Sequence, residues 1–228
     1  MKKIVDYVYE QTQIALTEEM QRQFDAYCEF LLAENEKYNL TAITEKDAVW
    51  EKHFADSVLG SLDVAMGASI CDIGSGAGFP ALPLKIVRPD VSVTLVDSLE
   101  KRIRFTQMLA EKLQISADFY HCRAEDFATA HSEQFDVATA RAVAPLPILL
   151  EYTAQIVKIG GIVLAYKTDE TELLSAQNAC RLLGLQYQSC RNFTLPDGSK
   201  RCLLRFLKVA HTPTKYPRGQ NKPRKNPL

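Results

Sequence analysis

The stretch that decides the fold of this 228-residue chain is Ile70–Pro80, which reads ICDIGSGAGFP. It has the pattern of a short apolar strand, a glycine-rich turn and the start of a helix. Glycines allow the main chain a positive φ and let a ligand approach the backbone closely. The spacing D-x-G-x-G-x-G is neither the G-x-G-x-x-G of dinucleotide-binding proteins nor a phosphate loop, which needs G-K-[ST]. The turn therefore predicts a ligand site that does not require pyrophosphate spacing.

The composition is that of a globular protein. Hydrophobic residues make up 46% and charged residues 24% of the chain, which is ordinary for a soluble protein with one substantial core and a small appended unit. No apolar run approaches the roughly 18 residues of a membrane span. The first residues, MKKIVD, also lack the apolar core of a signal peptide. We therefore expect a cytoplasmic protein without a membrane partner.

Cysteine usage argues against a metal centre. The six cysteines are scattered, and none forms a C-x-x-C pair, so zinc and redox motifs are unsupported. Without a secretion signal, such cysteines are expected to be reduced thiols. They are Cys28, Cys71, Cys122, Cys180, Cys190 and Cys202.

The net charge of −1 hides an asymmetry between the end of the chain and the rest. Residues 198–228 contain nine basic residues and no acid, which leaves a net charge of −10 on residues 1–197. Such a split indicates either a polyanionic partner or a solvated tail that keeps the protein soluble. The nine are Lys200, Arg201, Arg205, Lys208, Lys215, Arg218, Lys222, Arg224 and Lys225.

The pattern of apolar residues divides the chain into three parts. Residues 1–65 have helical spacing, with Thr17 as a predicted N-cap. Residues 66–210 alternate between strands and helices, which predicts an α/β, Rossmann-like sheet of seven strands with an antiparallel edge. Residues 211–228 are basic and proline-rich, and we expect them to be partly disordered. The expected strands are Ser69–Ile73, Val91–Val96, Ala117–Cys122, Phe135–Thr139, Ile162–Tyr166, Leu185–Arg191 and Cys202–Lys208; the expected helices among them are Phe79–Val87, Leu99–Leu113, Pro145–Val157 and Thr171–Leu183.

Polar residues follow several of these strands. In an open α/β sheet a ligand lies at the carboxyl ends of the strands, where the strand order reverses. The glycine turn, Asp97, Glu125 and Arg141 should therefore converge on one crevice. Each has a simpler explanation: Asp97 could cap the next helix, Glu125 could be a solvated acid, and Arg141 could pair with a structural carboxylate.

The glycine turn resembles the first motif of S-adenosylmethionine-dependent methyltransferases, whose ligand carries an amino acid and no phosphate. In such a site Asp97 would accept hydrogen bonds from the two ribose hydroxyls. A main-chain N–H and an acid at Ala124-Glu125 would bind the edge of the adenine. The predicted cofactor contacts are Asp72, Gly74, Gly76, Gly78, Phe79, Asp97, Ala124, Glu125 and Arg141.

Several segments spread over nearly the whole chain carry a more specific resemblance. They are Asn35–Thr44 (NEKYNLTAIT), His53–Ser57 (HFADS), Asp72–Pro80, Ile86–Pro89, Val96–Arg102, Arg123–Glu125, Ala140–Ala142 and Lys215–Arg218. Through these segments the chain resembles the small-subunit ribosomal RNA methyltransferase G family, also called glucose-inhibited division protein B. One departure is Glu34, where the family usually has Trp.

The resemblance implies a class I methyltransferase sheet and transfer of a methyl group from S-adenosylmethionine to N7 of a guanine in the decoding region of 16S rRNA, with S-adenosylhomocysteine as product. It also implies cofactor contacts at Gly74, Phe79, Ala124, Glu125 and Arg141. The expected partner is 16S rRNA or the small ribosomal subunit, and the expected state is a monomer.

The chemistry of guanine N7 sets what the residues must do. N7 has a lone pair and no proton, so its attack on a methyl group needs no general base, and catalysis should come from alignment. We expect Arg141 to orient the base or close the cofactor site and to carry no proton. RNA affinity should be electrostatic. The predicted RNA contacts are His53, Lys167, Lys200, Arg201, Lys215 and Arg218.

Other functions remain open from the residues. The same cofactor could serve a different RNA, a small molecule or a protein. An NAD-dependent oxidoreductase is disfavoured by the glycine spacing. A non-enzymatic RNA-binding or assembly factor is disfavoured by the intact turn together with Asp97 and Glu125.

Overall fold

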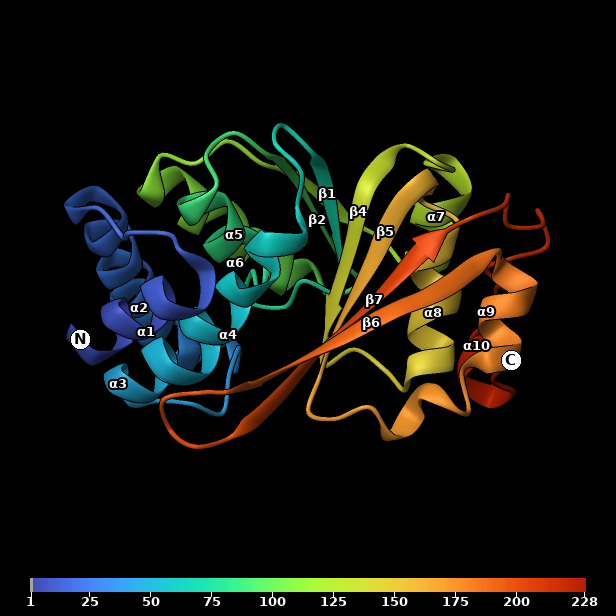
Figure 1. Ribbon diagram of the computed structural model, residues 1–228. Coiled ribbons are helices and arrows are strands. Elements are labelled where there is room, and N and C mark those ends of the chain that lie inside the picture. The colour runs from blue at the N-terminus through green and yellow to red at the C-terminus, as the bar shows by residue number, and fades with distance from the viewer. Residues whose placement is uncertain (1) are drawn as a thin grey trace.

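One seven-stranded sheet organises the protein in the computed structural model, which describes residues 2–228 (Figure 1). The strand order is β3-β2-β1-β4-β5-β7-β6. The first five strands are parallel, whereas β7 is antiparallel to both of its neighbours. The strands are β1 Ser69–Ile73, β2 Ser92–Asp97, β3 Asp118–His121, β4 Phe135–Arg141, β5 Val157–Lys167, β6 Leu185–Thr194 and β7 Lys200–Lys208.

Helices cover both faces of the sheet, with α1–α6 on one side and α7–α10 on the other (Figure 1). The N-terminal helices are α1 Lys2–Thr12, α2 Glu18–Tyr38, α3 Lys46–Val49 and α4 Ala55–Val58. A π-helical turn, η1 Trp50–Phe54, lies between α3 and α4, and a 3₁₀ turn, η2 Leu59–Asp63, follows α4. The remaining helices are α5 Ala81–Val87, α6 Glu100–Leu113, α7 Ala124–Ala130, α8 Leu146–Ala154, α9 Gln177–Leu183 and α10 Lys222–Lys225, with a 3₁₀ turn η3 Thr171–Leu173 before α9.

The strands carry apolar side chains on both faces because each face is covered. On β5, Ile162 and Leu164 pack with the N-terminal helices, while Val163 and Ala165 pack with α8 and α9. Successive side chains of a strand point to opposite faces, so a strand buried on both sides is apolar without interruption. The sequence prediction of a seven-stranded α/β sheet with an antiparallel edge is therefore confirmed.

The N-terminal helices join the glycine turn through α2. The buried hydroxyl of Tyr27 donates a hydrogen bond of 2.6 Å to the Ala77 carbonyl. The Tyr27 ring stacks on Phe79, with the ring centroids 5.3 Å apart. Thr17 caps α2 through the Met20 amide, as its position predicts. The N-terminal helices therefore share one apolar cluster with the sheet.

Several boundaries differ from the sequence prediction for local reasons. The helix after the glycine turn begins at Ala81 and not at Phe79. The strand β5 begins at Val157 and not at Ile162, so Gly160 and Gly161 lie inside the strand and not before it. They lie beside a register shift in the pairing of β5 with β4. A Cβ on Gly161 would come within 2.6 Å of the Asp136 carbonyl, so the irregular pairing requires a glycine there. Helix α7 was not predicted from the sequence; its buried residues are Glu125, Phe127 and Ala128.

The expectation that residues 211–228 are partly disordered is wrong. Glu151 on α8 is fully buried and accepts three hydrogen bonds from Arg218: one from its main-chain N–H at 2.8 Å and two from its guanidinium at 2.8 and 2.7 Å. Tyr216 is also buried against the same face of the sheet. The composition of the tail resembles that of disordered segments, but a buried carboxylate and an apolar surface on α8 hold it in place.

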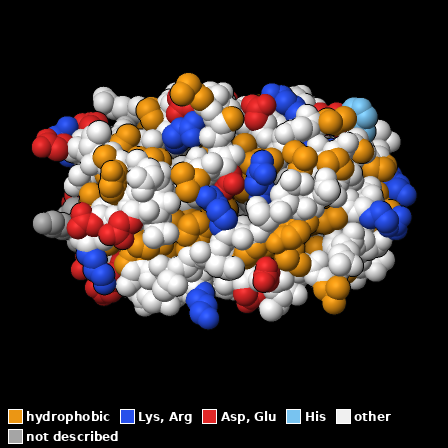
Figure 2. Space-filling view, viewed as in Figure 1, with side chains coloured by type: hydrophobic (Ala, Val, Ile, Leu, Met, Phe, Trp, Pro, Cys, Tyr) orange, Lys and Arg blue, Asp and Glu red, His pale blue; other side chains and the backbone are white. Residues whose placement is uncertain are grey.

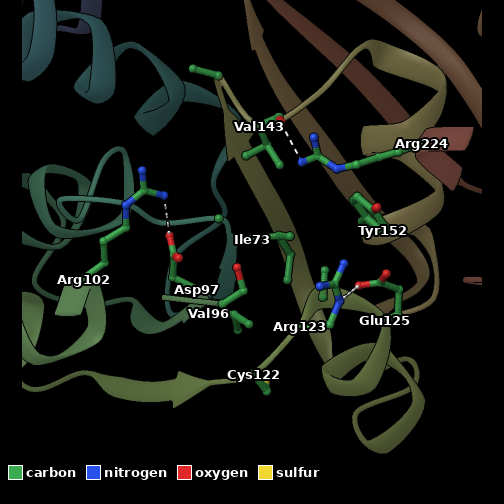
Figure 3. A pocket seen from close by; sticks show the side chains of 14 residues that line it. Ile73, Val96, Asp97, Arg102, Cys122, Arg123, Glu125, Val143, Tyr152 and Arg224 are labelled. Carbon is green, nitrogen blue, oxygen red and sulfur yellow. Dashed lines mark hydrogen bonds and ion pairs between the residues drawn. The ribbon is translucent and has the colours of Figure 1, made fainter. Parts of the chain in front are cut away.

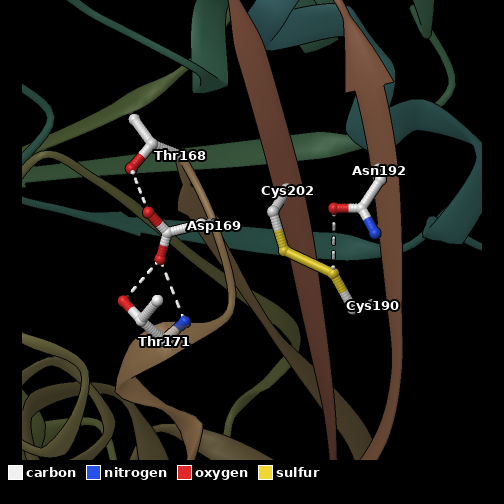
Figure 4. Close-up of a disulfide and its surroundings, with 6 residues drawn as sticks. All are labelled: Thr168, Asp169, Thr171, Cys190, Asn192 and Cys202. Atoms are coloured by element: carbon white, nitrogen blue, oxygen red, sulfur yellow. Dashed lines mark hydrogen bonds between the residues drawn. A yellow bond between two sulfur atoms is a disulfide. The ribbon is translucent and has the colours of Figure 1, made fainter.

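The expectation of reduced thiols also needs a correction. Cys190 on β6 and Cys202 on β7 are joined in a disulfide (Figure 4). Cys202 pairs with Asn192 in the strand register, so Cys190 is its diagonal neighbour on the adjacent strand. Cys28, Cys71, Cys122 and Cys180 are free. No helix among residues 2–228 is both long and apolar enough to cross a membrane.

We predict that Arg218→Met lowers the free energy of unfolding by about 3 kcal/mol, because it leaves a carboxylate buried without its cation. Urea unfolding followed by circular dichroism measures the effect. Lys222→Met is the matched control, since Lys222 is exposed in the same segment. Equal stability of the two variants would show that the tail does not pack on α8.

Candidate functional site

A crevice of about 330 Å³ opens at the carboxyl ends of β1, β2, β3 and β4 (Figure 3). The strand order reverses between β1 and β4, so their following loops leave toward opposite faces of the sheet and open a gap. The crevice is lined by Ile73, Gly74, Val96, Asp97, Ser98, Arg102, Cys122, Arg123, Ala124, Glu125, Ala142, Val143, Tyr152 and Arg224.

The glycine turn is fixed to β2 by its own amides. The N–H groups of Gly74 and Ser75 both donate to the Val96 carbonyl, at 2.8 and 3.1 Å. Gly74 has a φ of +73°, and a Cβ there would lie 2.7 Å from the Val143 side chain. The turn therefore presents a tightly packed wall to the crevice, with these amides used internally and not directed at a ligand.

Asp97 both supports the turn and faces the crevice. One carboxylate oxygen accepts from the Leu99 N–H at 2.9 Å, just before α6. The other accepts from the Gly76 N–H at 3.0 Å and lies 3.3 Å from Arg102. A carboxylate offers about four lone-pair directions, so Asp97 has capacity for a further donor. The N-cap of α6 is Leu99, without a side-chain cap, so Asp97 holds the turn before the helix and does not cap the helix itself.

Glu125 is a buried acid with an unused oxygen. Its side chain is 8% exposed, which excludes the solvated loop acid considered above. Oε2 lies 3.6 Å from Arg123 Nε, whereas Oε1 is buried and has no hydrogen-bond partner. A buried acceptor without a donor is costly. This oxygen therefore marks a place where a ligand N–H is expected.

Asp72 does not line the crevice, although the motif placed it among the cofactor contacts. It is fully buried beneath the turn, where it accepts a hydrogen bond of 2.9 Å from the Thr139 hydroxyl. Burial raises the pKa of its carboxyl well above the usual value. The residue supports the junction of β1 and β4 from below, and a direct contact with a ligand does not fit this position.

Arg141 ties the end of β4 to the N-terminal helices. Its guanidinium lies 2.9 Å from the Asp56 carboxylate, donates to His53 Nδ1 at 3.0 Å and lies 4.8 Å from the centre of the Phe79 ring. Asp56 is also 3.5 Å from Arg201. The alternative in which Arg141 pairs with a structural carboxylate is therefore realised, and the same side chain still borders two hollows.

His53 is held neutral in this cluster. Because Arg141 donates to Nδ1, the proton of the neutral ring lies on Nε2, which is 2.9 Å from the Thr41 hydroxyl. Burial, reinforced by the nearby charge of Arg141, lowers the pKa of His53 to about 3. The ring also stacks on Phe79, with the centroids 4.5 Å apart. A neutral imidazole thus joins the loop after α2 to Arg141.

Two further hollows continue the crevice along the ends of β4 and β5. One of about 200 Å³ lies between the glycine turn and Thr41. The other, of about 350 Å³, is lined by Lys52, His53, Asp56, Arg141, Tyr166, Lys167 and Arg201, among others. Arg141 and Ala142 border both, and Ala142 also borders the first crevice. The three spaces therefore meet at the end of β4.

The residues predicted to bind RNA divide into two groups. His53, Lys167 and Arg201 line the hollow beyond β4, where Lys167 is paired with Glu172 at 2.9 Å. Lys200 and Lys215 are exposed, and Arg218 is paired with the buried Glu151. On the face shown in Figure 2, Lys and Arg side chains are interspersed with Asp and Glu and form no continuous basic surface.

The structure adds lining residues that the sequence reading missed. Arg102 follows the end of β2 by one helical turn, and Tyr152 lies on a helix whose residues are almost all apolar. Arg224 comes from the segment expected to be disordered. Position relative to the strand ends would have identified Arg102, but nothing in the pattern indicates the other two.

No cluster of His, Cys, Asp and Glu in residues 2–228 has the arrangement of a metal site.

Among solved structures, the fold resembles the ribosomal protein L11 methylase of Lactobacillus delbrueckii subsp. bulgaricus, with a TM-score of 0.55, 16% identity and coverage of 70% of this chain and 80% of that one. It also resembles precorrin-6y C5,15-methyltransferase of Geobacter metallireducens, with a TM-score of 0.54, 12% identity and coverage of 77% and 96%.

Seven strands in this order, with a glycine turn after β1 and an acid after β2, define the class I S-adenosylmethionine-dependent methyltransferase fold. A family model described as rRNA small subunit methyltransferase G (GidB) matches residues 20–201. The chain belongs to this family. A protein of Streptococcus sanguinis with the name ribosomal RNA small subunit methyltransferase G is 48% identical over 223 residues, which cover 94% of each chain. A protein of the same name from Streptococcus agalactiae serotype V is 43% identical over 224 residues, also 94% of each.

We predict that His53 destabilises the fold in acid. The unfolded chain binds a proton near the ordinary pKa of 6.5, whereas the folded protein binds it only near 3. The unfolded state therefore holds more protons between these values, and stability falls as the pH drops through that window. In His53→Gln, which cannot titrate, the unfolding midpoint should decline less steeply between pH 6.5 and 4.

The control is His121→Gln, which removes an exposed histidine from the edge strand β3. Urea midpoints at several pH values compare the two variants with the unaltered protein. A slope that is the same for all three proteins would contradict a buried, neutral His53.

Proposed function

We propose that this protein transfers a methyl group from S-adenosylmethionine to N7 of a guanine in 16S rRNA of the small ribosomal subunit. The observation that carries the proposal is the buried, unpartnered Oε1 of Glu125 at the end of β3, in the same crevice as Asp97 at the end of β2. Membership of the family supplies the RNA substrate and the target atom.

The residues of the crevice fit this methyl donor. Glu125 Oε1 needs an N–H donor, and the exocyclic amine of adenine is one. Asp97 has a lone pair available for a ribose hydroxyl. Gly74 leaves no room for a side chain between the turn and Val143. The neighbouring hollow near Thr41 and Arg141 would then receive the methionine end.

The reaction requires alignment and no proton transfer at the nucleophile. S-adenosylmethionine supplies a methyl group on a positively charged sulfur. The guanine N7 lone pair forms the new N–C bond while the electron pair of the S–C bond returns to sulfur, so the positive charge moves to the purine. His53 is neutral and Arg141 is paired with Asp56, which limits the positive charge that these two residues place beside that ring. Holding the reacting atoms in line supplies most of the acceleration.

The guanine is assigned to the hollow beyond β4, on the other side of Arg141 from the proposed methyl-donor crevice. Lys52, Lys167 and Arg201 line this hollow together with Asp56, which gives it donors for phosphate or for guanine O6. A base in helical RNA would have to leave its stack to enter. The other RNA contacts that the sequence suggests remain predictions. The monomeric state and the cytoplasmic location of the enzyme are also predictions.

Methyl transfer to RNA tests the function. The protein is incubated with tritiated S-adenosylmethionine and either deproteinised 16S rRNA or small subunits, and the labelled base is mapped by chemical cleavage at 7-methylguanine. Label at one guanine N7 is expected. Label on protein, on another base or on no RNA would overturn the proposal.

Arg141→Lys should lower turnover by about a hundredfold, since it keeps the charge but loses the planar contacts to Asp56, His53 and Phe79 that fix the end of β4. Turnover and the dissociation constant for S-adenosylhomocysteine are measured separately. Arg104→Lys, which alters an exposed residue of α6, is the control. If both the binding of S-adenosylhomocysteine and the turnover were unchanged in Arg141→Lys, Arg141 would have no role in the site.

A further inference from the structure

The last residues of the chain reach the crevice. We use the name C-terminal strap for residues 212–226, which lie beyond the residues 20–201 matched by the family model. The strap follows β7, contacts α8 through Arg218 and Glu151, and ends in α10, which packs against α8. The strap lines the crevice through Arg224, and no other residue after β7 does so.

The strap is anchored away from the crevice. Arg218 is bound to the buried carboxylate of Glu151 and also donates to the Asn226 carbonyl at 2.8 Å. Tyr216 and Pro223 are buried. These contacts fix the segment on both sides of Asn221, so the residues that reach the crevice extend from a rigid support.

Two contacts join the strap to the loops that form the crevice. Arg123, directly before Ala124 and Glu125, donates to the Asn221 side-chain oxygen at 3.0 Å. Arg224 donates to the Val143 carbonyl at 3.3 Å, in the loop after β4. Figure 3 shows Arg224 extending over Tyr152 toward Val143, across the crevice from Asp97 and Arg102. The strap therefore bridges the loop after β3 and the loop after β4.

We propose that the C-terminal strap is part of the methyl-donor site and that Arg224 is a binding residue that closes its adenosine end. Glu125 Oε1 marks where the adenine amine would lie, and Arg224 forms the wall on the same side of the crevice. A planar guanidinium packs well on the face of a purine ring. This inference rests on the proposed function, because it takes the occupant of the crevice to be S-adenosylmethionine.

The basic residues after Ser199 are explained mainly by contacts within the protein, and not by an RNA-binding arm. All four arginines after Ser199 have a partner within the protein: Arg201 with Asp56, Arg205 with Asp63, Arg218 with Glu151 and Arg224 with the Val143 carbonyl. Lys208 is buried and donates to the Ala154 carbonyl at 2.6 Å. The lysines that remain exposed are Lys200, Lys215, Lys222 and Lys225. Much of the positive charge therefore holds the segment in place.

The test measures binding of S-adenosylhomocysteine and of 16S rRNA to the full chain. Arg224→Ala should weaken the binding of S-adenosylhomocysteine about tenfold, because it removes one contact with the purine ring and the hydrogen bond to the Val143 carbonyl. The affinity for RNA should be unchanged. Arg224→Lys keeps the charge without the plane and should give an intermediate value. Lys225→Ala, which removes a neighbouring exposed charge, is the control and should bind as the unaltered protein does.

A second measurement needs no variant. Hydrogen exchange on the unaltered protein should slow at residues 221–225 when saturating S-adenosylhomocysteine is added, and not when RNA alone is added. Equal affinity of Arg224→Ala and the unaltered protein, or protection of these residues by RNA only, would overturn the inference. Failure of the unaltered protein to bind S-adenosylhomocysteine would instead overturn the proposed function together with it.

Discussion

The crevice depends on one steric constraint, the contact between Gly74 and Val143. The missing side chain of Gly74 lets the loop after β1 and the loop after β4 touch at the point where the strand order reverses. On one side of this contact, the Gly74 and Ser75 amides fix the turn to β2. On the other side, the Val143 carbonyl accepts from Arg224. One contact thus sets the relative position of these two loops, of β2 and of the strap.

Buried charges hold the peripheral segments on the sheet. Asp56 on α4 is paired with Arg141 at the end of β4, and Glu151 on α8 is paired with Arg218 of the strap. The first pair joins a strand of the sheet to the N-terminal helices, and the second joins a helix that packs on the sheet to the strap. A buried pair adds less stability than an apolar contact of the same size, but it penalises every arrangement that separates the two charges. The same logic explains why the N-terminal helices and the strap have defined positions.

The sequence predicted the sheet and part of the crevice, because both follow from local patterns. Apolar strands alternating with helices give the parallel sheet. The rule that ligands lie at the ends of strands pointed to Gly74, Asp97, Ala124 and Glu125, which line the crevice, and to Arg141, which borders the two neighbouring hollows. Local patterns could not show that Asp72 faces the core, since a polar residue within a strand can lie on either face of the sheet. They also could not reveal Arg224, whose place depends on Glu151 and Arg218, 67 residues apart in the chain.

The sheet order has a consequence for how the protein is made. The strand β7 lies between β5 and β6, although it follows both in the chain. While β7 is still inside the ribosome, β5 and β6 have emerged with unpaired edges, and such edges readily pair with other chains. The last strand to be synthesised closes both edges at once, and the segment after it lines the crevice. A chain whose synthesis stops before β7 would therefore have an open sheet and would lack the segment that lines the crevice.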